Sequence, residues 1–237
     1  MNAHRINEGK YPDISNGKNA DFFFLEDDDP EHTAAQIVDL VKRRLPKAYQ
    51  VPTSAIKVLT PMQRGVVGAA NLNRLIQEAV NPTEVLLRRS GMTYRLNDRV
   101  MQIKNNYEKE VFNGDIGSIR ELDLENRTLS VLFDDRMVEY DVTELDELVL
   151  AYATTIHKSQ GSEYPIVIMP LLMTHYVMLQ RNMLYTGITR AKKLLVLIGS
   201  RKALWYSVRN VTVTGRNTKL RERLADMVFP PRKRING

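Results

Sequence analysis

The sequence predicts an α/β protein: a parallel sheet with helices on both faces, interrupted by a small antiparallel β-barrel. Apolar runs of strand length alternate with segments of helical periodicity near both ends, and short alternating runs between turn residues fill the middle. Runs such as 194–198 are apolar throughout, as is typical of strands buried on both faces. We therefore expect an α/β region over residues 1–88, an inserted barrel over 89–147, a return to the α/β region over 148–229 and a basic disordered tail over 230–237.

The α/β region before the barrel is expected to contain two strand–helix units. Residues 22–25 form a short apolar run that predicts a buried strand. Residues 31–45 carry apolar side chains at helical spacing, and Pro46 is expected to end this helix. Residues 55–60 predict a second strand, which leads through a loop into a helix over 68–80.

The barrel is predicted from short runs separated by Asn-Gly-Asp, Glu-Asn and Asp-Asp turns. Its expected strands span 99–103, 116–122, 128–133 and 137–142. The α/β pattern then returns. Its expected elements are strands over 148–152, 166–169 and 194–198, a helical turn over 155–160, and helices over 181–192, 202–209 and 218–227.

Composition limits the class of protein. The chain is 43% hydrophobic and 26% charged, as ordinary globular proteins are, and no run approaches the roughly 18 apolar residues of a membrane span. We expect no membrane partner. Cysteine is absent, which excludes disulfides and thiolate metal sites and fits a cytoplasmic protein. The net charge of +6 favours an anionic partner such as nucleic acid, although mild basicity is equally common in other soluble proteins.

Three polar segments adjoin predicted strand ends, where open α/β sheets bind ligands. The first, residues 60–68, contains glycines that could bring backbone amides to a phosphate, but it lacks the Lys-Ser/Thr of a P-loop. The alternative is a flexible loop with an exposed Arg64. The second, residues 153–164, gathers hydroxyls, an imidazole and a lysine suited to nucleic-acid phosphates. Its alternative is a polar connection with Thr154 or Thr155 as a helix N-cap.

The third segment, residues 185–193, contains Arg190 close to a predicted strand. A guanidinium there could offer a planar fork to the γ-phosphate of a nucleotide. The alternative is a helix C-terminus whose cations interact with the helix dipole. Position alone does not decide between the two.

Taken in order, these segments resemble motifs IV, V and VI of superfamily 1 helicases, most closely the RecD-like branch, which moves 5′ to 3′. The strings that carry the resemblance are Thr-Pro-Met-x-x-Gly-x-x-Gly-x-x-x-Leu-Asn, Thr-Ile-His-Lys-Ser-Gln-Gly-Ser-Glu-Tyr and Leu-Tyr-Thr-Gly-Ile-Thr-Arg-Ala-Lys, beginning at residues 60, 155 and 184. The family implies a second RecA-like motor domain interrupted by an SH3-like barrel. It also implies single-stranded DNA as a partner and a role in DNA repair and recombination.

The resemblance implies roles for individual residues. Arg190 would be an arginine finger on the γ-phosphate and Arg64 a second phosphate contact. The other residues expected near the nucleotide are Gly161, Glu163 and Tyr185, the last coupling its helix to the cleft. The residues expected at the DNA are Thr60, Thr155, His157, Lys158 and Ser159. The barrel residues that could follow the strand, or equally form a solvated face, are Arg95, Arg99, Lys104 and Lys109.

The chain lacks the Gly-x-x-x-x-Gly-Lys-Ser/Thr loop with which the family binds ATP, and Asp146-Glu147 is a poor substitute for its Mg²⁺-binding acid. We expect ATP and Mg²⁺ to require an absent N-terminal RecA-like domain, and this chain alone to bind no metal and to be inactive as an ATPase. The alternatives are a stand-alone, non-enzymatic module that binds single-stranded nucleic acid, and another superfamily 1 member such as the helicase domain of a conjugative relaxase.

Overall fold

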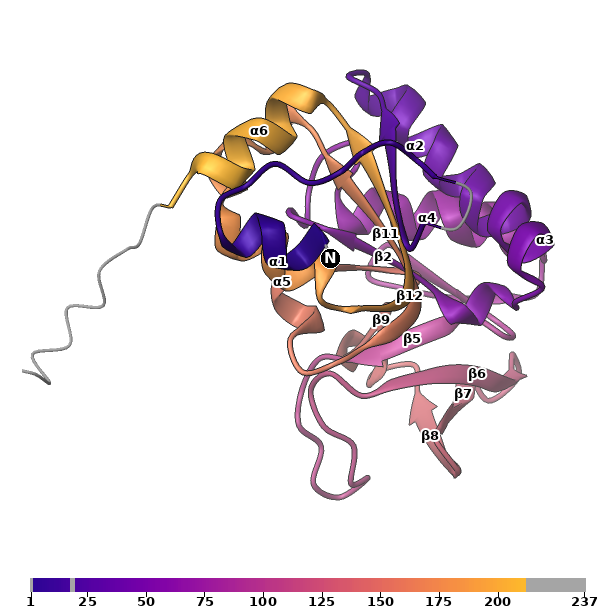
Figure 1. Ribbon diagram of the computed structural model, residues 1–237. Coiled ribbons are helices and arrows are strands. Elements are labelled where there is room, and N and C mark those ends of the chain that lie inside the picture. The colour runs from indigo at the N-terminus through magenta and orange to yellow at the C-terminus, as the bar shows by residue number, and fades with distance from the viewer. Residues whose placement is uncertain (1, 18–19, 212–237) are drawn as a thin grey trace, which may run out of the picture.

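The computed structural model describes residues 2–17 and 20–211, which form two β-sheet systems and their covering helices (Figure 1). One sheet has five strands in the order β1-β12-β11-β2-β10, and every neighbouring pair is parallel. Its strands are β1 (Phe22–Glu26), β2 (Ile56–Thr60), β10 (Ala153–Thr155), β11 (Tyr164–Leu171) and β12 (Ala191–Gly199). The predicted fold class is confirmed.

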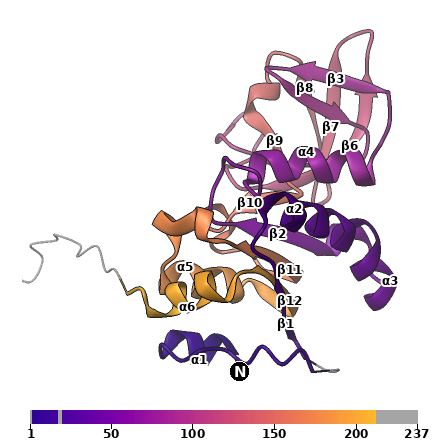
Figure 2. The ribbon, with the colours of Figure 1, turned by 90° about the horizontal axis from the view of Figure 1, so that it is seen from above.

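Helices cover both faces of this sheet (Figure 2). One face packs against α1 (Asn2–Asn7), α5 (Arg181–Ile188) and α6 (Arg201–Arg209) through a core that includes Val167, Met169 and Leu184. The other face packs against α2 (Pro30–Asp39), α3 (Leu45–Tyr49) and α4 (Ala69–Val80). Short 3₁₀ helices connect elements at Thr53–Ala55, Leu145–Glu147, His157–Ser159 and Met173–Met178.

The helix expected to end before Pro46 continues to Tyr49, so that expectation was wrong. Between α2 and α3 the chain makes a π-helical turn over Leu40–Arg44, and the amide of Leu45 donates to the carbonyl of Leu40. Pro46 therefore falls in the first turn of α3, where an amide hydrogen is not needed. The wider turn lets the helical path continue across the proline.

Two elements that follow the barrel also differ from expectation. The helix predicted over residues 181–192 ends at Ile188, because residues 191–199 form the long strand β12. The turn predicted at residues 155–160 begins with strand β10, which pairs with β2 in the register Thr155 to Thr60. The helix predicted over residues 218–227 and the tail at 230–237 lie outside the described residues.

The inserted barrel contains a five-stranded antiparallel sheet in the order β8-β7-β6-β5-β9 and a separate hairpin, β3-β4. Its strands are β3 (Leu86–Arg89), β4 (Met92–Arg95), β5 (Arg99–Gln102), β6 (Ile116–Asp123), β7 (Thr128–Phe133), β8 (Arg136–Asp141) and β9 (Leu148–Leu150). The β3-β4 hairpin was not predicted. The strand expected at 148–152 in the parallel sheet instead pairs antiparallel with β5 as β9, since Val100 faces Leu150.

A buried polar cluster joins the barrel to the α/β region. The carboxylate of Asp98, just before β5, is fully buried and accepts four hydrogen bonds. Its donors are the side chains of Gln77 (2.5 Å) and Asn81 (2.8 Å), the hydroxyl of Tyr152 (2.8 Å) and the amide of Arg95 (2.7 Å). The cluster connects helix α4, the barrel and the chain that returns to the parallel sheet.

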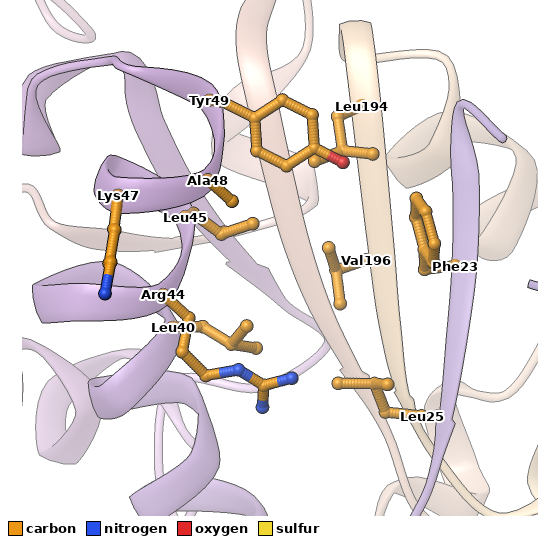
Figure 3. A pocket seen from close by; sticks show the side chains of 10 residues that line it. All are labelled: Phe23, Leu25, Leu40, Arg44, Leu45, Lys47, Ala48, Tyr49, Leu194 and Val196. Carbon is orange, nitrogen blue, oxygen red and sulfur yellow. The ribbon is translucent and has the colours of Figure 1, made fainter. Parts of the chain in front are cut away.

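An apolar groove of about 540 Å³ lies over strands β1 and β12, beside α3 (Figure 3). Phe23, Leu25 and Val196 project into it from the sheet, and Tyr49 closes one end. Within residues 2–17 and 20–211, no helix is both long and apolar enough to cross a membrane.

Candidate nucleotide and nucleic-acid site

The segment after β2 forms a closed loop that packs on the start of α4. The amides of Gly68, Ala69 and Ala70 donate to carbonyls within the loop at 3.0–3.1 Å. These amides are therefore not available to a phosphate, and the anion-binding interpretation of this helix start is not supported. A Cβ at Gly68 would lie 2.4 Å from the carbonyl of Arg64, so glycine permits the close approach. The Arg64 side chain itself is exposed.

Thr60 ends β2 and is fully buried. Its hydroxyl donates to the carbonyl of Val67 at 2.7 Å, which fixes the loop to the strand. Ser159 is also buried, and its hydroxyl donates to the carbonyl of Ile156 at 2.7 Å. Both residues were predicted to contact DNA. The structure instead gives both hydroxyls internal partners, so we no longer assign them to DNA.

The segment after β10 exposes the remaining predicted DNA residues. The amide of Ile156 donates to the carbonyl of Thr60 at 3.1 Å, which holds the start of the 3₁₀ helix beside the end of β2. His157 and Lys158 are exposed on that helix, and Thr155 is half-buried at the strand end. Ile156 occupies the N-cap position, and the hydroxyl of Thr155, one residue earlier, accepts a long hydrogen bond from the amide of Lys158 at 3.4 Å. An imidazole, an ammonium and a hydroxyl thus share the carboxyl end of β10.

Arg190 lies at the other end of the strands, directly before β12. Its carbonyl accepts a hydrogen bond from the amide of Tyr164 at 2.8 Å, at the amino end of β11. Its guanidinium donates to the carbonyls of Thr186 (3.2 Å) and Ser162 (3.1 Å) and to the hydroxyl of Thr189 (3.2 Å). All three acceptors are neutral oxygen atoms.

Other predicted nucleotide residues lie near Arg190. Glu163 forms an exposed ion pair with Lys192 at 3.2 Å, a partner that the sequence pattern did not predict although the opposite charges were a signal. Gly161 adopts a φ of +86°, which a side chain would strain. Tyr185 is 37% exposed on α5, and Thr189, the C-cap of that helix, follows it by four residues.

A small polar cavity of about 150 Å³ adjoins Arg190. It is lined by its neighbours Thr189 and Ala191, by Lys192 and Lys193, and by Asn2 of helix α1. The sequence pattern predicted no role for Asn2. Helix α1 packs beside α5 in both ribbon views, which brings the start of the described chain to this end of the sheet (Figures 1 and 2).

The structure thus separates the predicted residues into two groups. Thr155, His157 and Lys158 follow carboxyl ends of the parallel strands, whereas Glu163 and Arg190 precede amino ends. Arg64 is the exception among the predicted nucleotide contacts because it follows the carboxyl end of β2. The strands themselves therefore do not bring the guanidinium groups of Arg64 and Arg190 together.

Most predicted barrel cations have internal partners. Arg95 donates to the carbonyl of Asn81 at 2.8 Å, and Arg99 donates to the carbonyl of Ser54 at 2.7 Å. Burial lowers the pKa of Arg99. Lys104 is exposed. Among residues 2–17 and 20–211, no group of three or more carboxylate or imidazole side chains is arranged to hold a metal ion.

Comparisons with known proteins agree with an α/β region interrupted by a barrel. Residues 72–133 match the ATP-dependent RecD-like DNA helicase SH3 domain, and residues 150–198 match the UvrD-like helicase C-terminal domain. The fold is similar to that of a Pif1 helicase from Bacteroides, solved in complex with ADP-AlF3 and ssDNA. The TM-score is 0.50 at 14% identity, over 97% of this chain and 53% of that one.

Two curated relatives cover most of the chain. It is 41% identical over 170 residues to the ATP-dependent RecD2 DNA helicase of Deinococcus radiodurans, over 72% of this chain and 23% of the relative. It is 32% identical over 167 residues to the RecBCD enzyme subunit RecD of Haemophilus influenzae, over 70% and 25%, respectively. The chain spans about a quarter of the length of either relative. It belongs to the RecD-like helicases and corresponds to a C-terminal portion of their motor.

Proposed function

We propose that this chain is the second motor domain of an ATP-dependent DNA helicase that moves 5′ to 3′ along single-stranded DNA. The relative of 41% identity is an ATP-dependent DNA helicase, which supports the substrate and the reaction. The polarity rests on the resemblance of the three motifs to the RecD-like branch. The first motor domain, with its P-loop and magnesium ligands, would belong to the same longer protein.

One observation carries the nucleotide half of the proposal. The guanidinium of Arg190 is half-buried, and its hydrogen-bond acceptors are neutral oxygens of Thr186, Ser162 and Thr189. A charged phosphate forms stronger hydrogen bonds with a guanidinium than neutral oxygens do. A γ-phosphate at this end of the sheet would therefore displace one or more of these acceptors and gain a charge-stabilising contact during phosphoryl transfer.

The chain's own residues fit one side of an ATP site. Arg190 supplies positive charge, Glu163 and Gly161 approach the same end, and Tyr185 lies on the helix that precedes Arg190. ATP with Mg²⁺ would supply the transferable phosphoryl group. The chain has no lysine-bearing P-loop to hold it. We therefore expect the residues of this chain to stabilise charge across the cleft and not to bind the nucleotide tightly alone.

The DNA half of the proposal uses the opposite end of the strands. Thr155, His157 and Lys158 would contact the phosphate backbone, and the exposed Arg64, which follows the neighbouring strand, would join them. Closure of the two motor domains on ATP would shift this group along the strand. The residues that contact the DNA and those that contact the nucleotide would then lie at opposite ends of the strands within one domain.

ATP turnover and strand affinity of the 237-residue chain test the proposal. We expect no ATP hydrolysis above background, with or without single-stranded DNA, and we expect the chain to bind an oligo(dT) strand in a salt-dependent manner. A His157→Ala or Lys158→Ala change should weaken that binding. Robust hydrolysis that depends on Arg190 would refute the proposal that this is one half of a motor.

A further inference from the structure

The hydroxyl of Thr189, at the carboxyl end of helix α5, contacts the guanidinium of Arg190. It accepts a hydrogen bond from Nη2 of Arg190 at 3.2 Å and donates its own proton to the carbonyl of Thr186 at 3.0 Å. The same carbonyl accepts a hydrogen bond from Nε of Arg190 at 3.2 Å. The side chains of two consecutive residues therefore converge on one carbonyl oxygen of the last helical turn.

These contacts fix the orientation of the guanidinium. Nε and Nη2 lie along one edge of the group, and both are held at the end of α5. The third nitrogen, Nη1, donates to the carbonyl of Ser162 at 3.1 Å. Because the guanidinium is planar, two contacts along one edge set the direction in which the whole group points. Loss of the Thr189 hydroxyl would leave that edge held by the Thr186 carbonyl alone.

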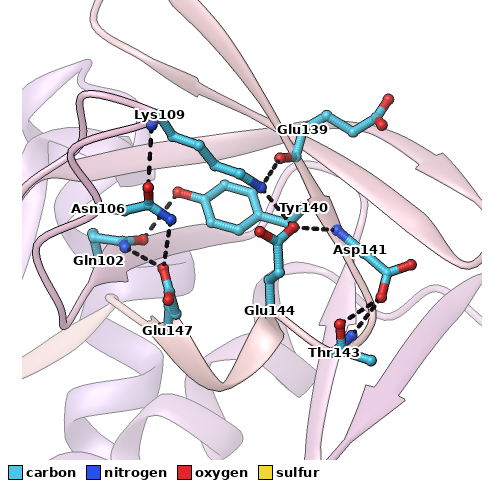
Figure 4. A network of polar contacts seen from close by, with 9 residues as sticks. All are labelled: Gln102, Asn106, Lys109, Glu139, Tyr140, Asp141, Thr143, Glu144 and Glu147. Carbon is cyan, nitrogen blue, oxygen red and sulfur yellow. Dashed lines mark hydrogen bonds and ion pairs between the residues drawn. The ribbon is translucent and has the colours of Figure 1, made fainter.

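The acceptors orient the guanidinium without neutralising its charge. The half-buried ammonium of Lys109 in the barrel is held differently, because it donates to the carboxylate of Glu144 at 2.5 Å within a network of polar contacts (Figure 4). The acceptors of Arg190 are one hydroxyl and two carbonyls, which carry no net charge. The positive charge of Arg190 is therefore kept for an anionic ligand, which forms stronger hydrogen bonds with a guanidinium than neutral oxygens do.

Thr189 also borders the polar cavity of about 150 Å³ beside Arg190. Lys192 and Lys193 line the same cavity, and both residues are exposed. Thr189 thus belongs to the surface that an anionic ligand near Arg190 would meet.

The contact with Thr189 and the contact with Ser162 differ in how they can change. Thr189 precedes Arg190 directly, so its contact moves with the arginine. Ser162 lies 28 residues earlier, before β11, and its carbonyl can be exchanged for another acceptor without a change at the end of α5. The Thr189 contact would therefore persist when a phosphate replaces the Ser162 carbonyl.

We propose that Thr189 is a positioning residue for ATP hydrolysis, whose hydroxyl holds the guanidinium of Arg190 in the plane from which it meets the γ-phosphate. The inference rests on the proposed function, in which Arg190 stabilises charge on that phosphate. Thr189 acts through Arg190 and does not itself touch the nucleotide. The sequence pattern predicted no role for Thr189.

The 237-residue chain tests the contact in the absence of ATP. In ¹H–¹⁵N spectra, the Nε–H resonance of Arg190 is assigned by its loss in Arg190→Lys. Its hydrogen should exchange slowly with solvent in the wild type and several-fold faster in Thr189→Val, because valine keeps the shape of threonine but lacks the hydroxyl. Thr189→Ser, which keeps the hydroxyl, should restore slow exchange. Equal exchange rates in the wild type and Thr189→Val would overturn the proposal.

ATP turnover by the longer protein tests the role in the reaction. Thr189→Val should lower kcat at saturating DNA by about 10- to 100-fold with little change in the KM for ATP, because a misplaced guanidinium loses its contact in the transition state. Thr189→Ser should restore most of this loss. Thr143→Val is the matched control, since it removes a hydroxyl that donates to the carboxylate of Asp141 at 2.8 Å in the barrel (Figure 4), and it should leave kcat unchanged.

A double substitution separates positioning from a structural role at the end of α5. In an Arg190→Ala background, Thr189→Val should cause no further loss of kcat, because the group that it orients is absent. Thr189→Val should also weaken binding of ADP with aluminium fluoride, a mimic of the transferred phosphoryl group, and leave the affinity for ADP alone unchanged. An equal loss of kcat from Thr189→Val in both backgrounds would assign Thr189 to the stability of the helix and overturn the proposal.

The outcomes distinguish this proposal from the proposed function. If Arg190→Ala lowers kcat and Thr189→Val does not, the positioning role is overturned and the proposed function stands. Wild-type kcat in a folded Arg190→Ala protein would overturn the proposed function and the role of Thr189 together.

Discussion

At the residue scale, the carboxylate of Asp98 holds the barrel on the α/β region. Burial raises its pKa, while its hydrogen bonds act in the opposite direction. Each carboxylate oxygen accepts two hydrogen bonds: one oxygen from Gln77 and Arg95, the other from Asn81 and Tyr152. An amide at this position can present only one oxygen, so one pair of donors would face an NH₂ group.

We therefore predict that Asp98→Asn lowers the free energy of unfolding by about 1–3 kcal/mol, because two buried donors lose their acceptor. Urea unfolding of the 237-residue chain measures the change. Asp28→Asn, an exposed carboxylate just before α2, is the matched control and should stay within about 0.5 kcal/mol of wild type. Equal midpoints for the two variants would show that the cluster does not hold the junction.

His175 gives a second prediction at this scale. Burial lowers its pKa from 6.5 to about 4. Between pH 6.5 and pH 4 the unfolded chain therefore protonates His175 more readily than the folded chain does. The contribution of His175 to the free energy of unfolding is complete above pH 7 and is lost as the pH falls through that window. The loss should approach about 3 kcal/mol near pH 4.

Urea unfolding at pH 7.5 and pH 4.5 tests this, with His175→Gln as the comparison. The difference in stability between the two pH values should be smaller in the variant than in the wild type, because glutamine does not titrate. Identical pH dependence in both proteins would mean that His175 is not held neutral by the fold.

At the scale of elements, close approach of two neighbouring strands depends on Gly199, the last residue of β12. A Cβ there would lie 1.9 Å from the carbonyl oxygen and 2.6 Å from the carbonyl carbon of Leu171 in β11. Backbone cannot yield as a flexible side chain does. We predict that Gly199→Ala destabilises the chain by more than about 2 kcal/mol in urea unfolding. A Cβ at Gly17 would meet no atom within 4 Å, so Gly17→Ala should have little effect. A similar loss of stability in both variants would contradict this explanation.

Element types were largely predictable from hydrophobic pattern, and the errors have local causes. Pro46 did not end its helix because the π-turn at Leu40–Arg44 shifted the proline into a first-turn position. The β3-β4 hairpin was missed because its strands are charged, yet Ser90-Gly91 supplied a turn signal. Both residues have positive φ, +49° and +78°, as the favoured two-residue hairpin turn requires.

At the scale of the whole molecule, the sequence predicted which segments carry the candidate site residues but not how the fold divides them. The motif strings identified His157, Lys158 and Arg190. Their spacing in the chain could not show that they lie at opposite ends of the strands, because that depends on the order β1-β12-β11-β2-β10. Spacing likewise could not show that the hydroxyls of Thr60 and Ser159 point inward to backbone carbonyls.

The central claim follows from this division. Glu163 and Arg190, at the amino ends of the strands, act on the nucleotide. Thr155, His157 and Lys158, at the carboxyl ends, act on the DNA strand. Changes in one group should affect one property and spare the other. In the longer protein, Lys158→Ala should raise the DNA concentration needed for half-maximal stimulation of ATP hydrolysis. A change at Arg190 should leave the affinity for the DNA strand unchanged.

ATP turnover by the longer protein with Arg190 substituted tests the claim most directly. Arg190→Ala should lower kcat at saturating DNA by about 10³-fold or more with little change in the KM for ATP, and Arg190→Lys should restore little of it, since a lysine lacks the planar fork. Arg74→Ala, at an exposed arginine paired with Glu78 on α4, should behave as wild type. Wild-type kcat in a folded Arg190→Ala protein would contradict the account.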